Sequence, residues 1–252
     1  MLCAPNWSKR RHPDRFHVFS EFVVKFTPPL YVKAVMIDLD GTLLDTIPDL
    51  AIAANMMLAE LKMPALPESV IRNFVGKGIN NLIERTLTGS MDGKPDADLF
   101  QRALPVYERS YKAVNGKHTT LYPGVKEGLD LLRAQGFPLV CVTNKSERFT
   151  LPLLDYVSLS SYFVNVIAGD TLPQKKPDPA PLLHACVQLN VAPHEMLMIG
   201  DSLNDAQAAR AAGCPIFCVT YGYNEGHDVQ SLDVDAVVVS LVEATRLILK
   251  HD

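Results

Sequence analysis

Short apolar runs alternate along the chain with longer segments of helical periodicity. The six runs are rich in branched or apolar side chains and lie at residues 32–37, 139–142, 164–168, 196–199, 216–219 and 236–239. Runs of this length are typical of strands that are buried on both faces of a parallel sheet. The segments between them include three amphipathic helices, which we expect at residues 123–136, 179–189 and 203–212. The alternation predicts an α/β fold with a doubly wound parallel sheet.

Residues 46–118 interrupt this alternation, because they contain no apolar run that reads as a strand. The apolar residues between Leu50 and Leu61 fall on one helical face. Residues 80–87 and 97–114 also have a helical pattern, with Pro105 marking a kink or a break. We therefore expect a helical insert at residues 46–118, and a catalytic core formed by residues 32–45 and 119–252. An insert that directly follows a catalytic strand can act as a lid.

The first 31 residues differ from the rest. A basic cluster, Lys9-Arg10-Arg11, precedes an apolar stretch that is broken by Glu21 and Lys25. The apolar segment of a signal peptide would not tolerate those charges, and no small-residue cleavage site follows it. We expect residues 1–31 to form a poorly ordered extension.

Composition and charge narrow the class of partner. Hydrophobic residues make up 48% of the chain and charged residues 21%, which are globular values. The net charge of -4 divides into +4 over residues 1–33 and -8 over residues 34–252. The negative charge of this larger part argues against a nucleic-acid partner. The apolar runs are too short to span a membrane, and the five cysteines match no zinc spacing. We expect a cytoplasmic protein, monomeric or homodimeric, with a small-molecule partner.

Two acidic motifs follow apolar runs. In Asp38-Leu39-Asp40-Gly41-Thr42 the two carboxylates are spaced i and i+2 on an extended segment, so they point the same way and favour a cation between them. Asp201 and Asp205 are four residues apart at a junction between a loop and a helix, so both can face one site. Acidic oxygen ligands suit Mg²⁺. The alternatives are a charged turn at Asp38 and helix capping at Asp201.

Three further segments carry candidate chemistry. Thr143 and Asn144 end an apolar run, where a hydroxyl, an amide and free N–H groups can bind a phosphate oxygen or cap the next helix. Lys176 lies in a proline-stiffened segment, so its ammonium can neutralise a carboxylate nucleophile and a phosphoryl group, or be a solvated surface lysine. Gly76 and Lys77 precede a predicted helix, whose free N–H groups can receive a small carboxylate or only shape a turn.

The four motifs, in the order acid, Thr-Asn, Lys, acid, resemble those of the haloacid dehalogenase superfamily. The helical insert resembles the small helical cap of that superfamily, set on a Rossmann-like core. A closer likeness, to the bacterial phosphoglycolate phosphatases, is carried by residues 38–46, 74–78, 169–183 and 200–213.

The resemblance implies a role for each candidate residue. Asp38 would be the nucleophile that forms an aspartyl phosphate, and Asp40 the general acid and base. Lys176 would balance charge. Mg²⁺ would be bound by Asp38, Asp201 and the backbone carbonyl of Asp40. The phosphoryl group would be bound by Thr143 and Asn144, and the rest of the substrate by Gly76 and Lys77. Asp205, Gly41 and Thr42 would support these residues of the site.

The expected activity is Mg²⁺-dependent hydrolysis of a small phosphorylated metabolite, 2-phosphoglycolate. Other readings are a phosphatase for sugar phosphates, nucleotides or pyrophosphate, and a phosphomutase similar to β-phosphoglucomutase. A mutase needs cap groups that grip a sugar, and residues 46–118 show no clear pattern of that kind. A binding module without catalysis is a third class, against which the intact acidic and lysine motifs argue.

Overall fold

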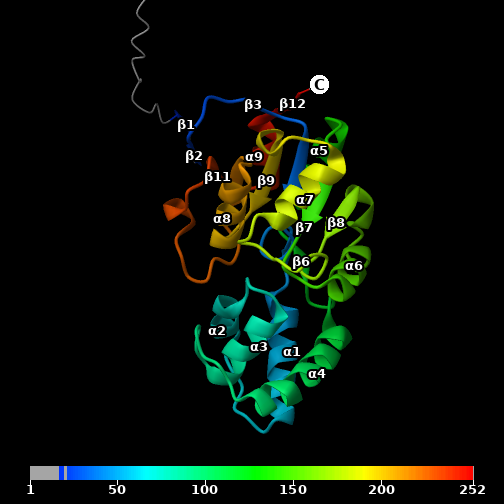
Figure 1. Cartoon of the computed structure of the whole chain (residues 1–252), viewed down its shortest axis with the longest axis vertical. Helices are drawn as coiled ribbons and strands as arrows, with labels where there is room; N and C mark the ends of the chain where they lie inside the picture. Colours follow the sequence, from blue (N-terminus) through cyan, green and yellow to red (C-terminus); the bar gives the residue numbers. More distant parts are fainter. Residues whose placement is uncertain (1–16, 20–21, 252) are drawn as a thin grey trace, which may run out of the picture.

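The computed structural model describes residues 17–19 and 22–251, with side chains from Val24 onward. Figure 1 shows two units along the long axis of the molecule, a sheet with helices around it and a group of helices below it. The sheet has the strand order β1-β2-β11-β10-β9-β4-β7-β8. The strands from β11 to β8 are parallel, and β1 and β2 form an antiparallel hairpin at one edge. The predicted α/β fold with a parallel sheet is confirmed.

The parallel strands are short, and apart from Asn165 at the start of β8 their side chains are apolar. Their bounds are β4 (Ala34–Ile37), β7 (Leu139–Val142), β8 (Asn165–Ile167), β9 (Met196–Gly200), β10 (Ile216–Val219) and β11 (Ala236–Val238). Side chains alternate between the two faces of the sheet. In β4, Val35 and Ile37 pack into one apolar cluster, and Ala34 and Met36 pack into another. Burial of both faces explains why the strands other than β8 lack polar side chains.

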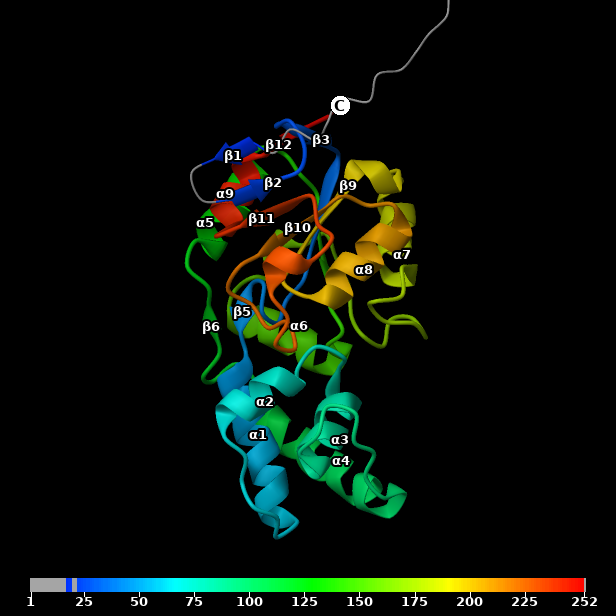
Figure 2. The ribbon, with the colours of Figure 1, turned by 90° about the vertical axis from the view of Figure 1, so that its left-hand side faces the viewer.

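Helices cover both faces of the sheet. The Val35 face carries α5 (Val125–Ala134), α6 (Glu147–Tyr156) and α9 (Leu241–Arg246), and the Met36 face carries α7 (Ala180–Leu189) and α8 (Leu203–Ala212). Figure 2 shows α7 and α8 on one side of the strands and α5 and α9 on the other. Three short 3-10 helices complete the unit, at Ser160–Tyr162, Pro193–Glu195 and Val229–Ser231.

The N-terminal region is more structured than the sequence indicates. Strand β1 (His17–Phe19) pairs with β2 (Phe22–Val24), which pairs with β11, while β3 (Leu30–Val32) pairs with the C-terminal β12 (Ile248–Lys250). Phe26 stacks on Phe217 with the ring centroids 5.6 Å apart. The structure therefore differs from the expected poorly ordered extension over residues 22–31, because its apolar residues cover a sheet edge. Residues 1–16 and 20–21 lie outside the described part of the chain.

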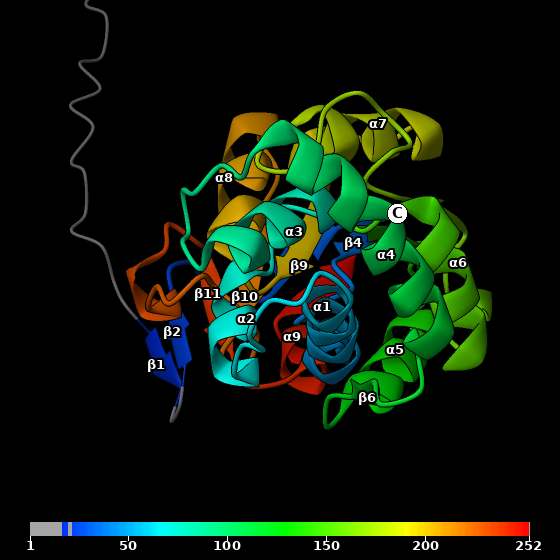
Figure 3. The same ribbon diagram turned by 90° about the horizontal axis from the view of Figure 1, so that it is seen from below.

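The second unit consists of α1 (Ile47–Glu60), α2 (Glu68–Phe74), α3 (Ile79–Thr88) and α4 (Ala97–Val114). These helices share an apolar cluster that includes Met57, Ile71 and Tyr107. Figure 3 shows α1, α2, α3 and α4 grouped across the lower end of the molecule. Helix α4 continues through Pro105 without the expected break, and α2 has no counterpart among the predicted helices.

Two crossings join the units. Strand β5 (Leu44–Asp45) leads into α1, and β6 (Thr120–Leu121) returns the chain and pairs antiparallel with β5. The fully buried Asp49 of α1 accepts hydrogen bonds from the N–H groups of Gly116 (2.9 Å), His118 (2.9 Å) and Thr119 (3.1 Å). One carboxylate thus ties the start of the first helix to the returning strand. Within the described residues, no helix is both long and apolar enough to cross a bilayer.

Candidate active site

Asp38 lies directly after β4, at the carboxyl end of the central strands, where α/β sheets place their sites. Its N–H donates to the Ile199 carbonyl at 3.0 Å, so the backbone is fixed as the strand ends. The chain then turns at Gly41, whose φ of +93° favours glycine. A Cβ at this position would come within 2.2 Å of Asp201 Oδ2. Thr42 Oγ1 donates to Asp201 Oδ1 at 2.9 Å, so the two acidic loops are joined.

Lys176 is a buried cation of the site, with an exposed fraction of 3%. Its Nζ lies 2.9 Å from Asp38 Oδ1 and 2.7 Å from Asp205 Oδ1, and it donates to the Val142 carbonyl at 2.7 Å. Burial alone would lower the pKa of Lys176, but the two carboxylates outweigh burial and raise the pKa above its usual value. Lys176 therefore remains an ammonium ion beside Asp38, and the reading of a solvated surface lysine does not apply.

Asp205 has a structural task as well as an electrostatic one. Its Oδ2 accepts from the N–H groups of Asp201 (3.2 Å) and Ser202 (3.1 Å) and from the Ser202 hydroxyl (2.7 Å). Ser202 and Asp205 form a capping box at the start of α8. Ser202 and Asp205, and not Asp201, therefore cap helix α8. The Asp201 side chain is left for the site.

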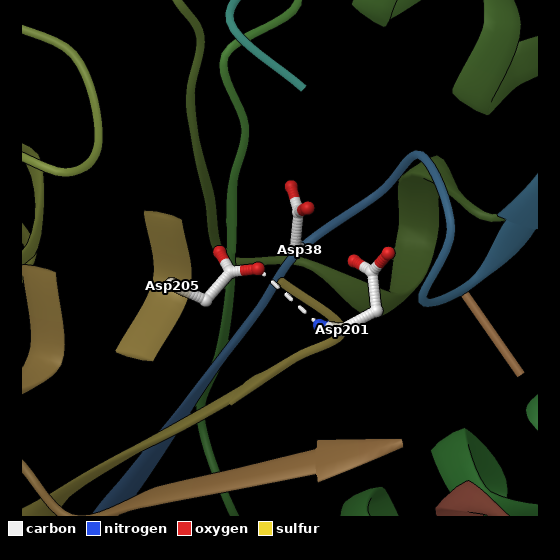
Figure 4. A group of neighbouring side chains, drawn as sticks. All are labelled: Asp38, Asp201 and Asp205. Atoms are coloured by element: carbon white, nitrogen blue, oxygen red, sulfur yellow. Dashed lines mark hydrogen bonds between the residues drawn. The ribbon is translucent and has the colours of Figure 1, made fainter. Parts of the chain in front are cut away.

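The acidic residues form a potential metal site. Carboxylate oxygens of Asp38, Asp201 and Asp205 all lie within 4.8 Å of one another, and Figure 4 shows the three side chains converging from β4, the β9 end and α8. Burial raises the pKa of Asp38 to about 7 although the Lys176 charge opposes that rise. Burial, and then the charges of Asp205 and Asp38, raise the pKa of Asp201 well above its usual value. When all three are ionised, these carboxylates meet one ammonium, so two negative charges are left for a cation to balance. A divalent cation held by carboxylate oxygens fits that excess, and Mg²⁺ prefers such ligands.

Asp40 is held by two donors on one oxygen. Its Oδ1 accepts from Thr46 Oγ1 at 2.7 Å and from Lys145 Nζ at 2.8 Å. Thr46 precedes α1, so this acid is connected to the start of the helical unit. Both donors bind Oδ1, which leaves Oδ2 for a substrate atom. The sequence analysis missed Lys145, although it directly follows the Thr143-Asn144 pair, because only the fold shows that its ammonium reaches Asp40.

Thr143 and Asn144 both lie at the site, but their polar groups are partly engaged. Thr143 Oγ1 accepts from the Lys145 N–H at 3.2 Å. Asn144 Nδ2 donates to the Lys176 carbonyl at 2.8 Å and to the Gly76 carbonyl at 3.0 Å. The Asn144 side chain therefore connects the Lys176 segment to the helical unit, and its amide nitrogen is not free for a phosphate.

Lys77 is the candidate that the structure does not bring to the site. Gly76 and Gly78 have positive φ values of 140° and 84°, and between them the Lys77 side chain stays 44% exposed, with Nζ 3.8 Å from Glu225 Oε2. Glu225, in a loop of the sheet unit, also pairs with the buried Arg85 of α3 at 2.9 Å. Gly76 contributes to the cavity wall and Lys77 does not, so this arrangement favours the expected binding role for Gly76, and the role of Lys77 stays a prediction.

A cavity of about 60 Å³ lies between the two units. A single water needs roughly 10–15 Å³ of such volume, so the cavity fits a ligand of few atoms. Both units contribute to its wall. The residues include Asp38, Asp40, Thr143, Lys145, Lys176 and Asp201 from the sheet unit, and Leu50, Gly76, Ile79, Leu82 and Tyr111 from the helical unit.

Comparison with known proteins identifies the class. The profile of the haloacid dehalogenase-like hydrolase family matches residues 35–219, and this chain belongs to that family, as its motifs predicted. Its relatives include the phosphoglycolate phosphatase of Nitrosospira multiformis, 64% identical over 88% of this chain and 98% of the relative, and that of Thiobacillus denitrificans, 54% identical over the same shares. A solved structure described as a predicted phosphoglycolate phosphatase from Haemophilus somnus has a TM-score of 0.80 at 31% identity, covering 84% of this chain and 96% of that one.

Proposed function

We propose that this protein is a phosphoglycolate phosphatase, which hydrolyses 2-phosphoglycolate to glycolate and phosphate with Mg²⁺. One observation carries the proposal: Asp38 and Asp40 both line a small cavity. There Lys176 Nζ lies 2.9 Å from Asp38 Oδ1. Relatives of up to 64% identity that bear this name support the choice of substrate.

The first step transfers the phosphoryl group to the protein. An Asp38 carboxylate oxygen attacks phosphorus, and the bond between phosphorus and the ester oxygen breaks as the aspartyl phosphate forms. Lys176 forms an ion pair with Asp38 through Oδ1 and places positive charge beside the phosphoryl oxygens. Asp40, protonated on Oδ2, gives its proton to the leaving glycolate oxygen.

The second step regenerates the enzyme. Water attacks the phosphorus of the aspartyl phosphate while Asp40, now a carboxylate, takes a proton from that water. The bond between phosphorus and the Asp38 oxygen breaks, and inorganic phosphate leaves. Thr46 and Lys145 hold Asp40 in place for both proton transfers.

The metal would be bound by Asp38 and Asp201, together with the backbone carbonyl of Asp40. When bound, Mg²⁺ supplies positive charge that offsets the negative charge of the phosphoryl group. Asp205 is occupied by Lys176 and by the three donors of the α8 cap, so we assign it the positioning of Lys176.

The helical unit would act as the cap that closes over the substrate, since the cavity wall includes residues of both units. A cavity of about 60 Å³ suits a two-carbon phosphate better than a nucleotide or a sugar bisphosphate, which disfavours the nucleotidase and phosphomutase readings. The described cysteines are free thiols, which agrees with a location in the reducing cytoplasm, and we expect a monomer or a homodimer.

The test measures phosphate release from 2-phosphoglycolate without any added bisphosphate. We expect turnover with Mg²⁺, loss of turnover in EDTA, recovery when Mg²⁺ is restored, and no turnover for Asp38→Asn. The Asp38→Asn protein should keep its fold, which circular dichroism checks. Turnover in EDTA would remove the metal from the mechanism, and an active Asp38→Asn variant would remove the nucleophile.

A further inference from the structure

Two hydroxyl groups at the cavity are buried and, within the described part of the chain, have no hydrogen-bond partner. They belong to Tyr111 of α4 and to Ser146, and both residues line the cavity. A buried hydroxyl without a partner costs roughly 1–3 kcal/mol. A ligand that supplies acceptors to both groups would remove that cost.

Tyr111 is a fixed, neutral donor. The residue is 1% exposed, and its ring contacts that of Phe149 with a centroid distance of 4.9 Å. Burial, and then the negative charges of Asp40 and Asp49, raise the pKa of Tyr111 well above its usual value. The side chain therefore keeps its proton and offers an O–H from the helical unit.

Ser146 is placed as a helix cap but does not act as one. It is the N-cap residue of α6, and its side chain makes no capping hydrogen bond. A serine at this position usually accepts from the second or third N–H group of the helix. Here the hydroxyl has no partner among the described residues, and Ser146 lines the cavity beside the positive end of a ten-residue helix.

Lys145 adds a positive charge to the same part of the cavity. Its Nζ lies 4.9 Å from the centroid of the Tyr111 ring, and the next residue in the chain is Ser146. An ammonium group has three N–H donors, and Asp40 Oδ1 takes one of them. The group can therefore bind a second anion while it holds Asp40.

We propose that Tyr111 and Ser146, with Lys145, bind the carboxylate of the substrate and so determine its specificity. This inference rests on the proposed function. Asp38 and Lys176 define where phosphorus lies, and Asp40 defines where the ester oxygen lies. In 2-phosphoglycolate a single carbon separates that oxygen from the carboxylate, so the carboxylate lies just beyond Asp40. Lys145, which contacts Asp40, is the cation at that distance.

The arrangement assigns substrate selection to a residue of α4 in the helical unit, together with the loop that follows β7. The exposed Lys77 is not required. Closure of the helical unit would bring the Tyr111 hydroxyl onto the carboxylate, so a substrate without a carboxylate would leave Tyr111 and Ser146 unpaired. A site built to hydrogen-bond a ligand group discriminates strongly against analogues that lack it.

The test compares Tyr111→Phe with Tyr107→Phe. Tyr107 is one turn away on α4, is fully buried and also has an unpaired hydroxyl, but it is not in the wall of the cavity. The substrates are 2-phosphoglycolate and ethyl phosphate, which has the same two carbons without the carboxylate. We expect Tyr111→Phe to raise the KM for 2-phosphoglycolate by about tenfold or more, because hydrogen bonds to charged groups are the stronger ones. Its KM for ethyl phosphate should change by less than about twofold, and Tyr107→Phe should change neither.

Ser146→Ala gives a second readout from the other unit, and we expect the same selective rise in KM. Equal effects of Tyr111→Phe on both substrates, or equal effects of Tyr111→Phe and Tyr107→Phe, would overturn the carboxylate site while leaving the proposed function in place. Wild-type protein that turns over ethyl phosphate as efficiently as 2-phosphoglycolate would overturn the proposed function, and the site with it.

Discussion

Replacing Asp205 with asparagine tests how Lys176 is held. Asp205 is fully buried, and its Oδ1 lies 2.7 Å from Lys176 Nζ while its Oδ2 accepts the three donors of the α8 cap. An asparagine has one carbonyl oxygen, so if that oxygen faces the cap, an N–H group faces the ammonium. Removing one partner of a buried ion pair costs about 3–5 kcal/mol. Loss of the Asp205 charge also relieves its repulsion of Asp38 and Asp201, so we expect the lower end of that range.

A loss of about 3 kcal/mol lowers the Tm of a protein of this size by roughly 6–12 °C. Thermal unfolding in EDTA, followed by circular dichroism, measures this shift without a metal contribution. The control is Asp233→Asn, which also removes a carboxylate from an ion pair, with Arg210, but at a side chain that is 77% exposed. Exposed pairs contribute about 0–1 kcal/mol. A Tm for Asp205→Asn close to that of Asp233→Asn would refute the view that a buried charge pair holds Lys176.

The remaining predictions concern the metal site and the junction between the units. Because the pKa of Asp38 is raised to about 7, Mg²⁺ must displace a proton as the pH falls below that value, so its affinity should rise from about pH 6 to about pH 8. Calorimetry in buffers of different ionisation enthalpy checks this, and an affinity that does not vary with pH would contradict it. Gly41→Ala should weaken Mg²⁺ binding by about tenfold or more, because the added Cβ would displace the Asp201 carboxylate. Calorimetry measures this affinity, and an unchanged value would contradict the close approach of Gly41 to Asp201. Asp49→Ala should lower the free energy of unfolding by about 2–4 kcal/mol, because three N–H groups lose a charged acceptor, and a urea midpoint equal to that of wild type would contradict this.

The fold class was predictable because its strands are buried on both faces. Such strands are continuous apolar runs, and the positions of β7, β9, β10 and β11 follow from them. The expected run at residues 32–37 divides at Lys33, whose N–H donates to the Glu195 carbonyl, so β3 and β4 join different sheets. The order in residues 22–31 was not predictable, because β2 and β3 pair with strands more than 200 residues later in the chain.

The candidate site was predictable where its residues follow strands, as Asp38, Thr143 and Asp201 do. Lys145 and Tyr111 carry no local signal. The contact of Lys145 with Asp40 depends on the pairing of β4 with β7, and its contact with the Tyr111 ring depends on how α4 packs over the sheet unit. Lys77 is the opposite case, and its role in substrate binding stays a prediction. A lysine between two glycines reads as a ligand-binding turn, but the backbone directs its side chain toward Glu225.

The most direct test of the account is a comparison of kcat/KM for phosphate release from 2-phosphoglycolate, a hexose phosphate, a nucleoside monophosphate and pyrophosphate, measured side by side with saturating Mg²⁺. The account predicts that 2-phosphoglycolate is preferred by about tenfold or more, because a small cavity and a carboxylate-binding wall both favour it. A larger kcat/KM for the hexose phosphate, the nucleotide or pyrophosphate would contradict it.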